Sequence, residues 1–196
     1  KNKKEILREF EKESWGMLDK FKDNLDEINI DKVENKYIPL LEKNSFYYRG
    51  KFYYASNREI LDSHILMYKD SLSKYISKAT SLIEFGAGFG SKIIRLSQYD
   101  LFKNIPKYAA ELTDSGQNLI NKISQSMNIT IEVGKIDLHS FQISNISIPK
   151  GGLIFTSYAS HYNPNMSKEF AEFLFSFKPI AVVNFEPCFE LYSDET

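Results

Sequence analysis

A run of glycines at alternate positions, preceded by a glutamate, is the feature of this sequence that points most directly to chemistry. Residues 81–90 read SLIEFGAGFG, a short apolar stretch that enters a glycine-rich turn, and the helical pattern SKIIRLS follows at once. Glycines let the backbone approach a ligand where a Cβ would collide, and the start of a helix offers free N–H groups. A strand, a glycine turn and a helix in this order indicate the first ligand-binding crossing of a doubly wound α/β sheet.

The spacing of the glycines separates three kinds of nucleotide site. The dinucleotide fingerprint needs glycine at its first, third and sixth places, and the sixth place here is Ser91. A phosphate-binding loop of the NTPase kind closes with Lys-Ser or Lys-Thr, and no such pair follows this turn. The remaining pattern is an acidic residue followed by three alternate glycines: Glu84, Gly86, Gly88 and Gly90.

Two further acidic residues come at or after the ends of later predicted strands. Glu111 ends the stretch 107–111, about 20 residues after the glycines, where a nucleoside-binding sheet needs an acceptor for ribose hydroxyls. Asp137 follows the stretch 130–133. Because the carboxyl ends of parallel strands meet at one edge, these carboxylates and Glu84 should surround one cleft. They suit a ligand with positive groups and ribose hydroxyls, although a solvated glutamate at a strand end is the alternative for Glu111.

This pattern resembles motif I of the class I S-adenosylmethionine (SAM)-dependent methyltransferases, and the resemblance covers about residues 80–186. It implies SAM as the cofactor, with the glycine turn packed against its amino-acid and ribose part. It also implies that Asp137 accepts a hydrogen bond from the adenine amino group, between apolar neighbours that sandwich the ring. The cofactor-binding residues it implies are Glu84, Phe85, Gly86, Ala87, Gly88, Gly90, Glu111, Leu112, Ile136, Asp137, Leu138 and Thr156.

The segments after the fourth and fifth predicted strands should carry the residues that handle the methyl acceptor. The fourth strand leads into TSYASHY, where this family keeps its acceptor-side residues. His161 is the best candidate for a general base by type and location, and Tyr158 for a pocket wall or hydrogen-bond donor. Pro187 stops the last strand, so Glu186 should project over the sheet edge to bind substrate, act as a base or close the pocket. Structural or solvated roles are the alternatives for all three.

The same region argues against a nucleic-acid substrate. DNA and RNA amino-methyltransferases carry an Asn-Pro-Pro-aromatic cluster at this strand end, whereas residues 163–166 read NPNM, which fits a turn and a helix cap. The chain has 25 Lys and Arg against 26 Asp and Glu, so no basic surplus exists to attract a phosphate backbone. We therefore expect a small-molecule acceptor.

The composition argues against disulfide-bonded, metal-binding and membrane proteins. Cys188 is the only cysteine, and His64, His139 and His161 lack the spacing of a metal motif, so we expect neither an internal disulfide nor a metal. No apolar run approaches the roughly 20 residues of a membrane span, and no signal-like segment opens the chain. We expect no membrane partner and a cytoplasmic location.

Residues 1–78 are predicted to form a helical cap with an aromatic hairpin, packed on the core. Its elements are a helix over 4–25, a helix over 31–42 interrupted near Pro39, a hairpin over 47–55, and a helix capped by Ser56 or Asn57 that reaches about 77. The hairpin aromatics indicate core and cross-strand packing, with a substrate-binding wall as the alternative. The apolar side of the last helix should consist of Ile60, Leu61, Ile65, Leu66, Tyr68 and Leu72.

Residues 79–196 alternate between strands and helices. The strands are expected at 81–85, 107–111, 130–133, 152–156 and 180–185, and the helices at 91–98, 115–127 and 166–177. Such βαβ units cross right-handed into a parallel sheet, so the fold class is α/β, doubly wound and mostly parallel. The core that the chain resembles has seven strands, the last two an antiparallel hairpin. We therefore expect an incomplete C-terminal end: either a C-terminal segment is disordered or removed, or a strand from a second copy or a partner docks on the open edge at 180–185.

These features predict a SAM-dependent methyltransferase that acts on a small polar or glycan-type acceptor, at oxygen. The helical front section resembles the variable N-terminal caps that roof the acceptor pocket in small-molecule members. The glycine turn, FTSY at 155–158 and FEP at 185–187 together resemble methyltransferases found among bacterial surface-polysaccharide (capsule) genes. The alternatives are a SAM-fold module that binds without turnover and an NAD-dependent oxidoreductase, which Ser91 disfavours.

Overall fold

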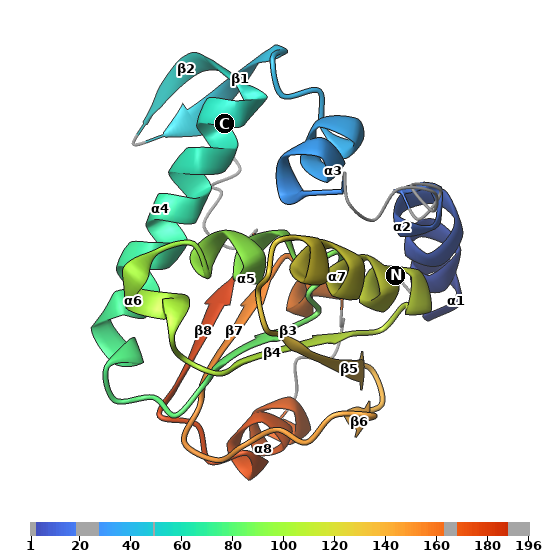
Figure 1. Ribbon diagram of the computed structural model, residues 1–196, viewed down its shortest axis with the longest axis vertical. Coiled ribbons are helices and arrows are strands. Elements are labelled where there is room, and N and C mark those ends of the chain that lie inside the picture. The colour runs from blue at the N-terminus through green and yellow to red at the C-terminus, as the bar shows by residue number, and fades with distance from the viewer. Residues whose placement is uncertain (1–2, 19–27, 49, 163–167, 188–196) are drawn as a thin grey trace.

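The computed structural model describes residues 3–18, 28–48, 50–162 and 168–187, and its centre is one six-stranded sheet (Figure 1). The strands are β3 (Leu82–Phe85), β4 (Lys107–Glu111), β5 (Glu132–Asp137), β6 (Gln142–Ser144), β7 (Leu153–Ser157) and β8 (Ala181–Phe185). Their order across the sheet is β6-β5-β4-β3-β7-β8, and every pair is parallel except β5 with β6. The predicted doubly wound, mostly parallel sheet is confirmed.

The strand order places the glycine turn at the point where the chain changes direction across the sheet. From β3 the chain adds β4 and β5 on one side, and it then returns to add β7 and β8 on the other. Strand β3 therefore pairs with both β4 and β7. In open α/β sheets, ligands bind at this topological switch point, beyond the carboxyl ends of the strands.

Helices cover both faces of the sheet. Helices α4 (Asn57–Ile76), α5 (Ser91–Leu96) and α7 (Asp114–Ser126) lie on one face, and α8 (Lys168–Ser176) lies on the other (Figure 1). Alternate strand residues point to the two sides, so Leu82 packs in the first core cluster and Ile83 in the second. Burial of both faces explains why these strands are continuous apolar runs. A short helix, α6 (Asp100–Lys103), follows α5.

The third predicted strand differs most from the structure. It was expected at residues 130–133, but β5 continues to Asp137 and pairs antiparallel with β6. Lys135 and Asp137 break the apolar pattern by which strands are recognised, which hides this part of β5. Asp137 therefore ends the strand rather than following it. Strand β6 was not predicted because only three residues form it.

The N-terminal section is helical, as expected, but its first helix is irregular. It consists of α1 (Lys3–Ile6), a π-helix η1 (Leu7–Ser14) and α2 (Trp15–Leu18), and α3 (Ile30–Tyr37) follows. The second half of the predicted helix 4–25 lies largely outside the described residues. Helix α3 ends earlier than expected because Pro39 disfavours helical geometry in the residue before it.

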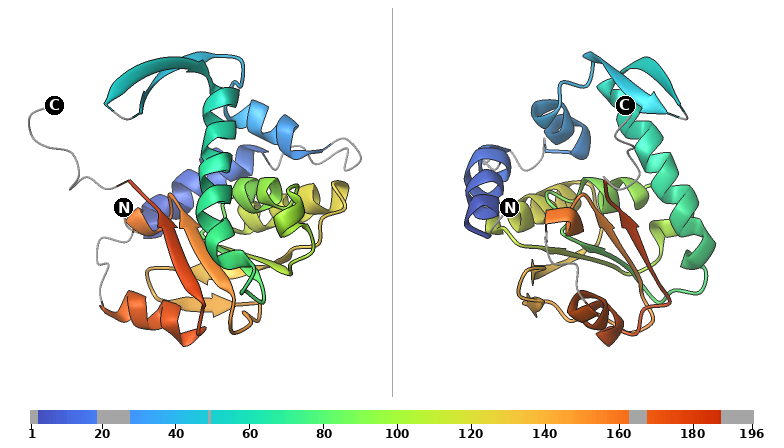
Figure 2. Two further views of the ribbon diagram at one scale, coloured as in Figure 1. Left: turned by 90° about the vertical axis from the view of Figure 1, so that its left-hand side faces the viewer. Right: turned by 180° about the vertical axis from the view of Figure 1, so that it is seen from behind.

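The aromatic hairpin projects from the body of the protein. Strands β1 (Lys43–Tyr48) and β2 (Lys51–Ser56) lie at the end of α4 farthest from the sheet (Figure 2). Phe46 stacks on its cross-strand partner Tyr53 with ring centroids 5.6 Å apart, which confirms cross-strand packing for this pair. The prediction of core packing was wrong for Phe52 and Tyr54, because these residues are 74% and 82% exposed.

Helix α4 joins the hairpin to the sheet. Ser56 caps it in a capping box: its hydroxyl accepts from the Glu59 N–H while the Glu59 carboxylate accepts from the Ser56 N–H. Its buried residues are Ile65, Tyr68, Leu72 and Ile76, a stripe at helical spacing. Leu66, expected on this stripe, is instead 46% exposed. No helix in the described part of the chain is long and apolar enough to span a membrane.

Replacing Leu72 with alanine should reduce the free energy of unfolding by about 2–5 kcal/mol, because the side chain is fully buried between α4 and the sheet. Leu66→Ala is the matched control on the same helix, and its effect should stay within about 0.5 kcal/mol. Urea unfolding of the two variants measures the difference. Equal losses would contradict the assignment of the buried stripe.

Candidate functional site

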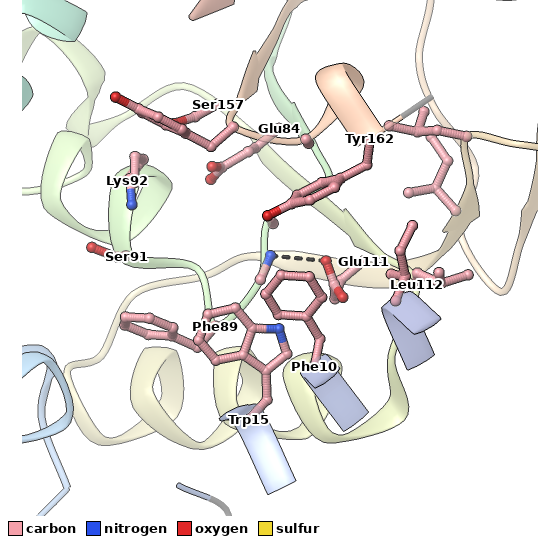
Figure 3. Close-up of a pocket in the computed structure, with 18 of the residues that line it drawn as sticks. Phe10, Trp15, Glu84, Phe89, Ser91, Lys92, Glu111, Leu112, Ser157 and Tyr162 are labelled. Carbon is pink, nitrogen blue, oxygen red and sulfur yellow. Dashed lines mark hydrogen bonds between the residues drawn. The ribbon is translucent and has the colours of Figure 1, made fainter. Parts of the chain in front are cut away.

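A cavity of about 280 Å³ opens beyond the carboxyl ends of the sheet strands (Figure 3). Four parts of the chain line it: the glycine turn, the ends of β4 and β5, the loop after β7, and the N-terminal section. The expected site residues that line it are Glu84, Gly86, Ala87, Gly88, Glu111, Leu112, Ile136, Leu138 and Tyr158. The switch point of the sheet thus carries a real cavity, and most of the expected cofactor residues face it.

The three glycines of the turn all have left-handed backbone conformations, but they meet different neighbours. A Cβ on Gly86 would lie 2.3 Å from the Cβ of Ala159, in the loop after β7. A Cβ on Gly88 would approach the Trp15 ring to 3.1 Å. Gly90 caps α5, and a Cβ there would lie 2.9 Å from Ile120 of α7. Gly90 therefore serves helix packing and, unlike the other two, does not line the cavity.

Glu111 connects the end of β4 to the glycine turn. Its Oε2 accepts a hydrogen bond from the Gly88 N–H at 2.9 Å, and its Oε1 accepts from the Thr113 N–H and hydroxyl at 3.1 and 2.8 Å (Figure 3). Burial raises the pKa of this carboxyl, and the hydrogen bonds from Thr113 and Gly88 oppose that rise. The side chain fixes the turn and at the same time presents a carboxylate to the cavity.

Glu84 presents a second carboxyl to the cavity from inside β3. The side chain is 1% exposed, and its Oε2 accepts from the Ile93 N–H at 3.1 Å. Burial raises the pKa of Glu84 to about 8, although the charge of Lys92 and the Ile93 hydrogen bond act in the opposite direction. At neutral pH this carboxyl is therefore largely protonated. A cation placed beside it would favour its ionised form.

The N-terminal helices close the cavity above the glycine turn. Phe10 and Trp15 stack with ring centroids 5.5 Å apart, and Trp15 meets Phe89 of the turn edge-on (Figure 3). The Glu11 carboxylate accepts from the Asp114 and Ser115 N–H groups at 2.8 and 3.1 Å, which ties η1 to the start of α7. Sequence reasoning missed these residues as part of the site, although the single tryptophan of the chain was a usable signal.

Asp137 lies outside the lining of the cavity. Its carboxylate binds the Lys3 ammonium and accepts from the His139 N–H at 3.0 Å. Burial acts to raise its pKa, but these hydrogen bonds hold the pKa of Asp137 below its ordinary value. Its neighbours Ile136 and Leu138 do line the cavity, as expected for apolar groups around a ring. The adenine contact of Asp137 remains a prediction.

Phe85 and Thr156 also lie away from the cavity, and strand alternation explains why. Glu84 faces the cavity, so the next residue, Phe85, points to the opposite face, where it meets Phe177 at 5.5 Å. The Thr156 hydroxyl lies within hydrogen-bond distance of two side chains of the β8 segment, Asn184 Oδ1 and Glu186 Oε1. Both residues support the site without lining it.

His161 and Glu186 form a pair behind the cavity wall. The His161 Nδ1 lies 2.9 Å from Glu186 Oε2, and Glu186 Oε1 accepts from the Ala159 and Ser160 N–H groups. Neither side chain lines the cavity, but the His161 ring packs on Tyr162, which does, at 4.0 Å. Burial tends to raise the pKa of Glu186, and the Thr156 and His161 hydrogen bonds bring it below its usual value. The pair thus fixes the loop after β7.

Tyr158 begins this loop and lines the cavity with a strained backbone, at φ +53°. Residues 163–166, which were interpreted as a turn and cap, lie outside the described residues. Within the described ranges, no group of three His, Cys, Asp or Glu side chains could hold a metal ion. The absence of a metal stays a prediction.

Comparison with solved structures identifies the fold class. Coclaurine N-methyltransferase bound to N-methylheliamine and S-adenosylhomocysteine (SAH) matches 90% of this chain with a TM-score of 0.50 at 15% identity. A SAM-dependent methyltransferase from Aquifex aeolicus matches 68% with a TM-score of 0.45 at 16% identity, and it aligns over 76% of its own length. The Pyrococcus abyssi tRNA (uracil-54, C5)-methyltransferase in complex with SAH matches 73%, with a TM-score of 0.47 at 9% identity.

The chain has the class I methyltransferase-like α/β fold, as expected. It spans 51% of the coclaurine enzyme and 34% of the tRNA enzyme, less than two thirds of either. No protein-family model and no curated protein sequence matches it. The similarity therefore establishes the fold, and the activity has to be argued from the site.

Proposed function

We propose that this protein is a SAM-dependent methyltransferase that acts on a small polar or glycan-type acceptor, at oxygen. The observation that carries the proposal is the buried Glu111 carboxylate, which holds Gly88 of the glycine turn and faces a cavity at the switch point. A carboxylate and a glycine turn in these places suit a ribose and an amino-acid tail. Glu84 supplies a second carboxyl, which suits the ammonium of that tail.

The residues of the cavity would act by placement and by exclusion of water. SAM, when bound, supplies a methyl group on a positively charged sulfur. An acceptor oxygen forms the new bond to the methyl carbon while the carbon–sulfur bond breaks onto sulfur, and the hydroxyl proton leaves to water. This in-line displacement depends on how the two reactants are held. Phe10, Trp15 and Tyr162 line the cavity and would limit the access of water to the reacting atoms.

The His161–Glu186 pair supports this chemistry from behind the wall. Since neither side chain lines the cavity, we infer that the pair positions Tyr158 and Tyr162 rather than touching the acceptor. The general-base role predicted for His161 is the competing proposal. The two differ in their expected pH dependence.

Glu186→Ala and His161→Ala should each lower turnover up to about a hundredfold through misplacement of the loop, with SAM affinity nearly unchanged. If the pair only positions the loop, the acid limb of the pH–rate profile should persist in both variants. Loss of that limb in His161→Ala, with a fall in turnover on the order of 10³, would instead make His161 the base.

Transfer of a tritiated methyl group from SAM tests the activity itself. We expect label in at least one member of a panel of hydroxyl compounds, nucleotide sugars and small acids. Glu111→Ala protein serves as the matched control, and it should transfer much less. SAM binding without transfer to any panel member would favour a binding module without turnover.

A further inference from the structure

A second cavity of about 240 Å³ adjoins the first, between α4 and α5. The two spaces meet at the residues that line both cavities, which are Ile38, Leu61, Ser91, Lys92 and Tyr158. The rest of the second cavity is largely apolar and includes Ile60 and Ile65 of α4. Since a cavity of about 150 Å³ accepts benzene, this one has room for a substituted ring or a chain of similar size.

The cation at the junction is available for a ligand. Lys92 projects from α5 on the side of the first cavity away from Glu111 (Figure 3). Among the residues that the structure describes, none forms an ion pair or hydrogen bond with its ammonium, whose charge acts on Glu84 and His64 only at longer range. A half-buried ammonium without a partner favours an anionic ligand group.

The other carboxylates near the junction are already occupied. Glu34 is fully buried and binds Arg58, Arg95 and the Ser91 hydroxyl. Glu111 is held by the glycine turn and Thr113, as described above. The charge of Lys92 also acts on Glu84, whose carboxylate the proposed function assigns to the ammonium of SAM, so no side chain in the described part of the protein pairs directly with Lys92.

The titratable groups that face the second cavity add hydrogen-bonding capacity and no second charge. His64 has a pKa below its ordinary value, first because it is buried and second because Lys92 is near, so it is neutral at pH 7. The Tyr68 hydroxyl is buried and pairs with the Ser157 hydroxyl at 3.0 Å. Burial raises the pKa of Tyr68 to about 12, so it also stays neutral. One cation therefore faces an otherwise neutral, mainly apolar space.

Tyr158 marks the place where the cavities meet. It has a left-handed backbone at φ +53°, a conformation that is uncommon for a non-glycine residue. Its N–H donates to the Phe185 carbonyl at 3.0 Å, which holds the strained residue against β8. The side chain thus stands between the space for the cofactor and the space beside Lys92.

We propose that the second cavity binds the methyl acceptor, a small polar molecule whose anionic group, carboxylate or phosphate, pairs with Lys92 and whose apolar part packs against Ile60 and Ile65. This inference rests on the proposed function, because it assigns the first cavity to SAM. The anionic group anchors the acceptor, and the oxygen to be methylated lies toward Tyr158. The tyrosine is then the wall that aligns the two reactants.

Matched pairs of anionic and neutral probes test the inference. Benzoate with benzamide, phenylacetate with phenylacetamide, and phenyl phosphate with phenol are titrated into the protein with the first cavity saturated by SAH, and ligand-observed NMR reports binding. At least one anion should bind tenfold or more tightly than its neutral partner. Whether a carboxylate or the phosphate shows the preference identifies the class of anion.

Two variants test whether Lys92 and the second cavity cause the preference for anionic probes. Lys92→Met should remove the preference for the anion when enough SAH is added to saturate the first cavity of the variant, because loss of this charge also raises the pKa of Glu84. Lys78→Met, an exposed lysine outside both cavities, is the matched control and should keep the preference. Leu61→Trp should fill the junction and weaken both members of each pair. Circular dichroism and melting temperature verify that each variant is folded.

The outcomes separate the two proposals. Normal SAH binding with no anion preferred over its partner would overturn the inference and leave the proposed function standing. A preference for the anion that persists in Lys92→Met would also overturn it, because another group would then hold the anion. Failure of the parent protein to bind SAH would remove the proposed function and the inference with it.

Discussion

Replacing Glu111 with alanine should weaken SAM binding about ten- to a hundredfold. The ribose hydroxyls would lose a charged hydrogen-bond acceptor, which costs on the order of 1.5–3 kcal/mol. The Gly88 N–H would lose its partner at the same time, so the glycine turn itself should loosen. Titration calorimetry of the variant against the parent protein measures the effect.

Two further variants make the Glu111 test specific. Glu42→Ala removes an exposed glutamate that does not line the cavity and should leave SAM affinity unchanged. Glu111→Gln keeps the size of the side chain and removes its charge, so its affinity should fall between the other two. If Glu111→Ala binds SAM as tightly as the parent protein, the assignment of Glu111 at the end of β4 to the ribose of SAM is wrong.

The affinity for SAH should rise roughly fiftyfold between pH 6 and pH 8 and then level off. Burial raises the pKa of Glu84 to about 8, whereas the ammonium of a bound ligand favours the ionised carboxylate. Binding must therefore remove a proton below pH 8, and the apparent affinity falls about tenfold for each unit of pH below that value. The affinity rises with pH because the pKa of Glu84 is raised. A carboxyl that titrated near 4.5 would already be ionised throughout this range, and the affinity would not change.

Glu84→Gln is the control for the pH dependence. It cannot release a proton, so its SAH affinity should be weaker and nearly flat from pH 6 to pH 8. Calorimetry in two buffers of different ionisation enthalpy should also show proton release by the parent protein at pH 7 and none by the variant. A steep pH dependence in Glu84→Gln would assign the proton to another group.

The parts of the site that local sequence determines could be predicted. Glu84 and the glycine turn lie within one strand–turn–helix unit, and their arrangement follows from that unit alone. Glu111 could also be predicted, because the end of the next parallel strand must reach the same edge of the sheet. The parallel pairing of the strands followed from the alternation of strands and helices.

The parts that depend on contacts between distant residues could not be predicted. Asp137 binds Lys3, which lies 134 residues earlier, so no local pattern indicated that its carboxylate was occupied. Trp15 sits over Gly88 only because the π-helix and Glu11 hold α2 against α7. A ligand-binding role for Lys92 could not be predicted, because it depends on the lack of an ion-pair partner among the described residues. Only the three-dimensional structure shows this.

Calorimetric titration of the parent protein with SAH, and separately with NAD, tests the central claim most directly. The account predicts one site for SAH with a dissociation constant in about the micromolar range, and no heat of binding for NAD at the same concentrations. The Ser91 hydroxyl, bound to Glu34 at 2.6 Å, occupies the place where a dinucleotide fingerprint needs glycine. Saturable binding of NAD, with no binding of SAH, would contradict the account.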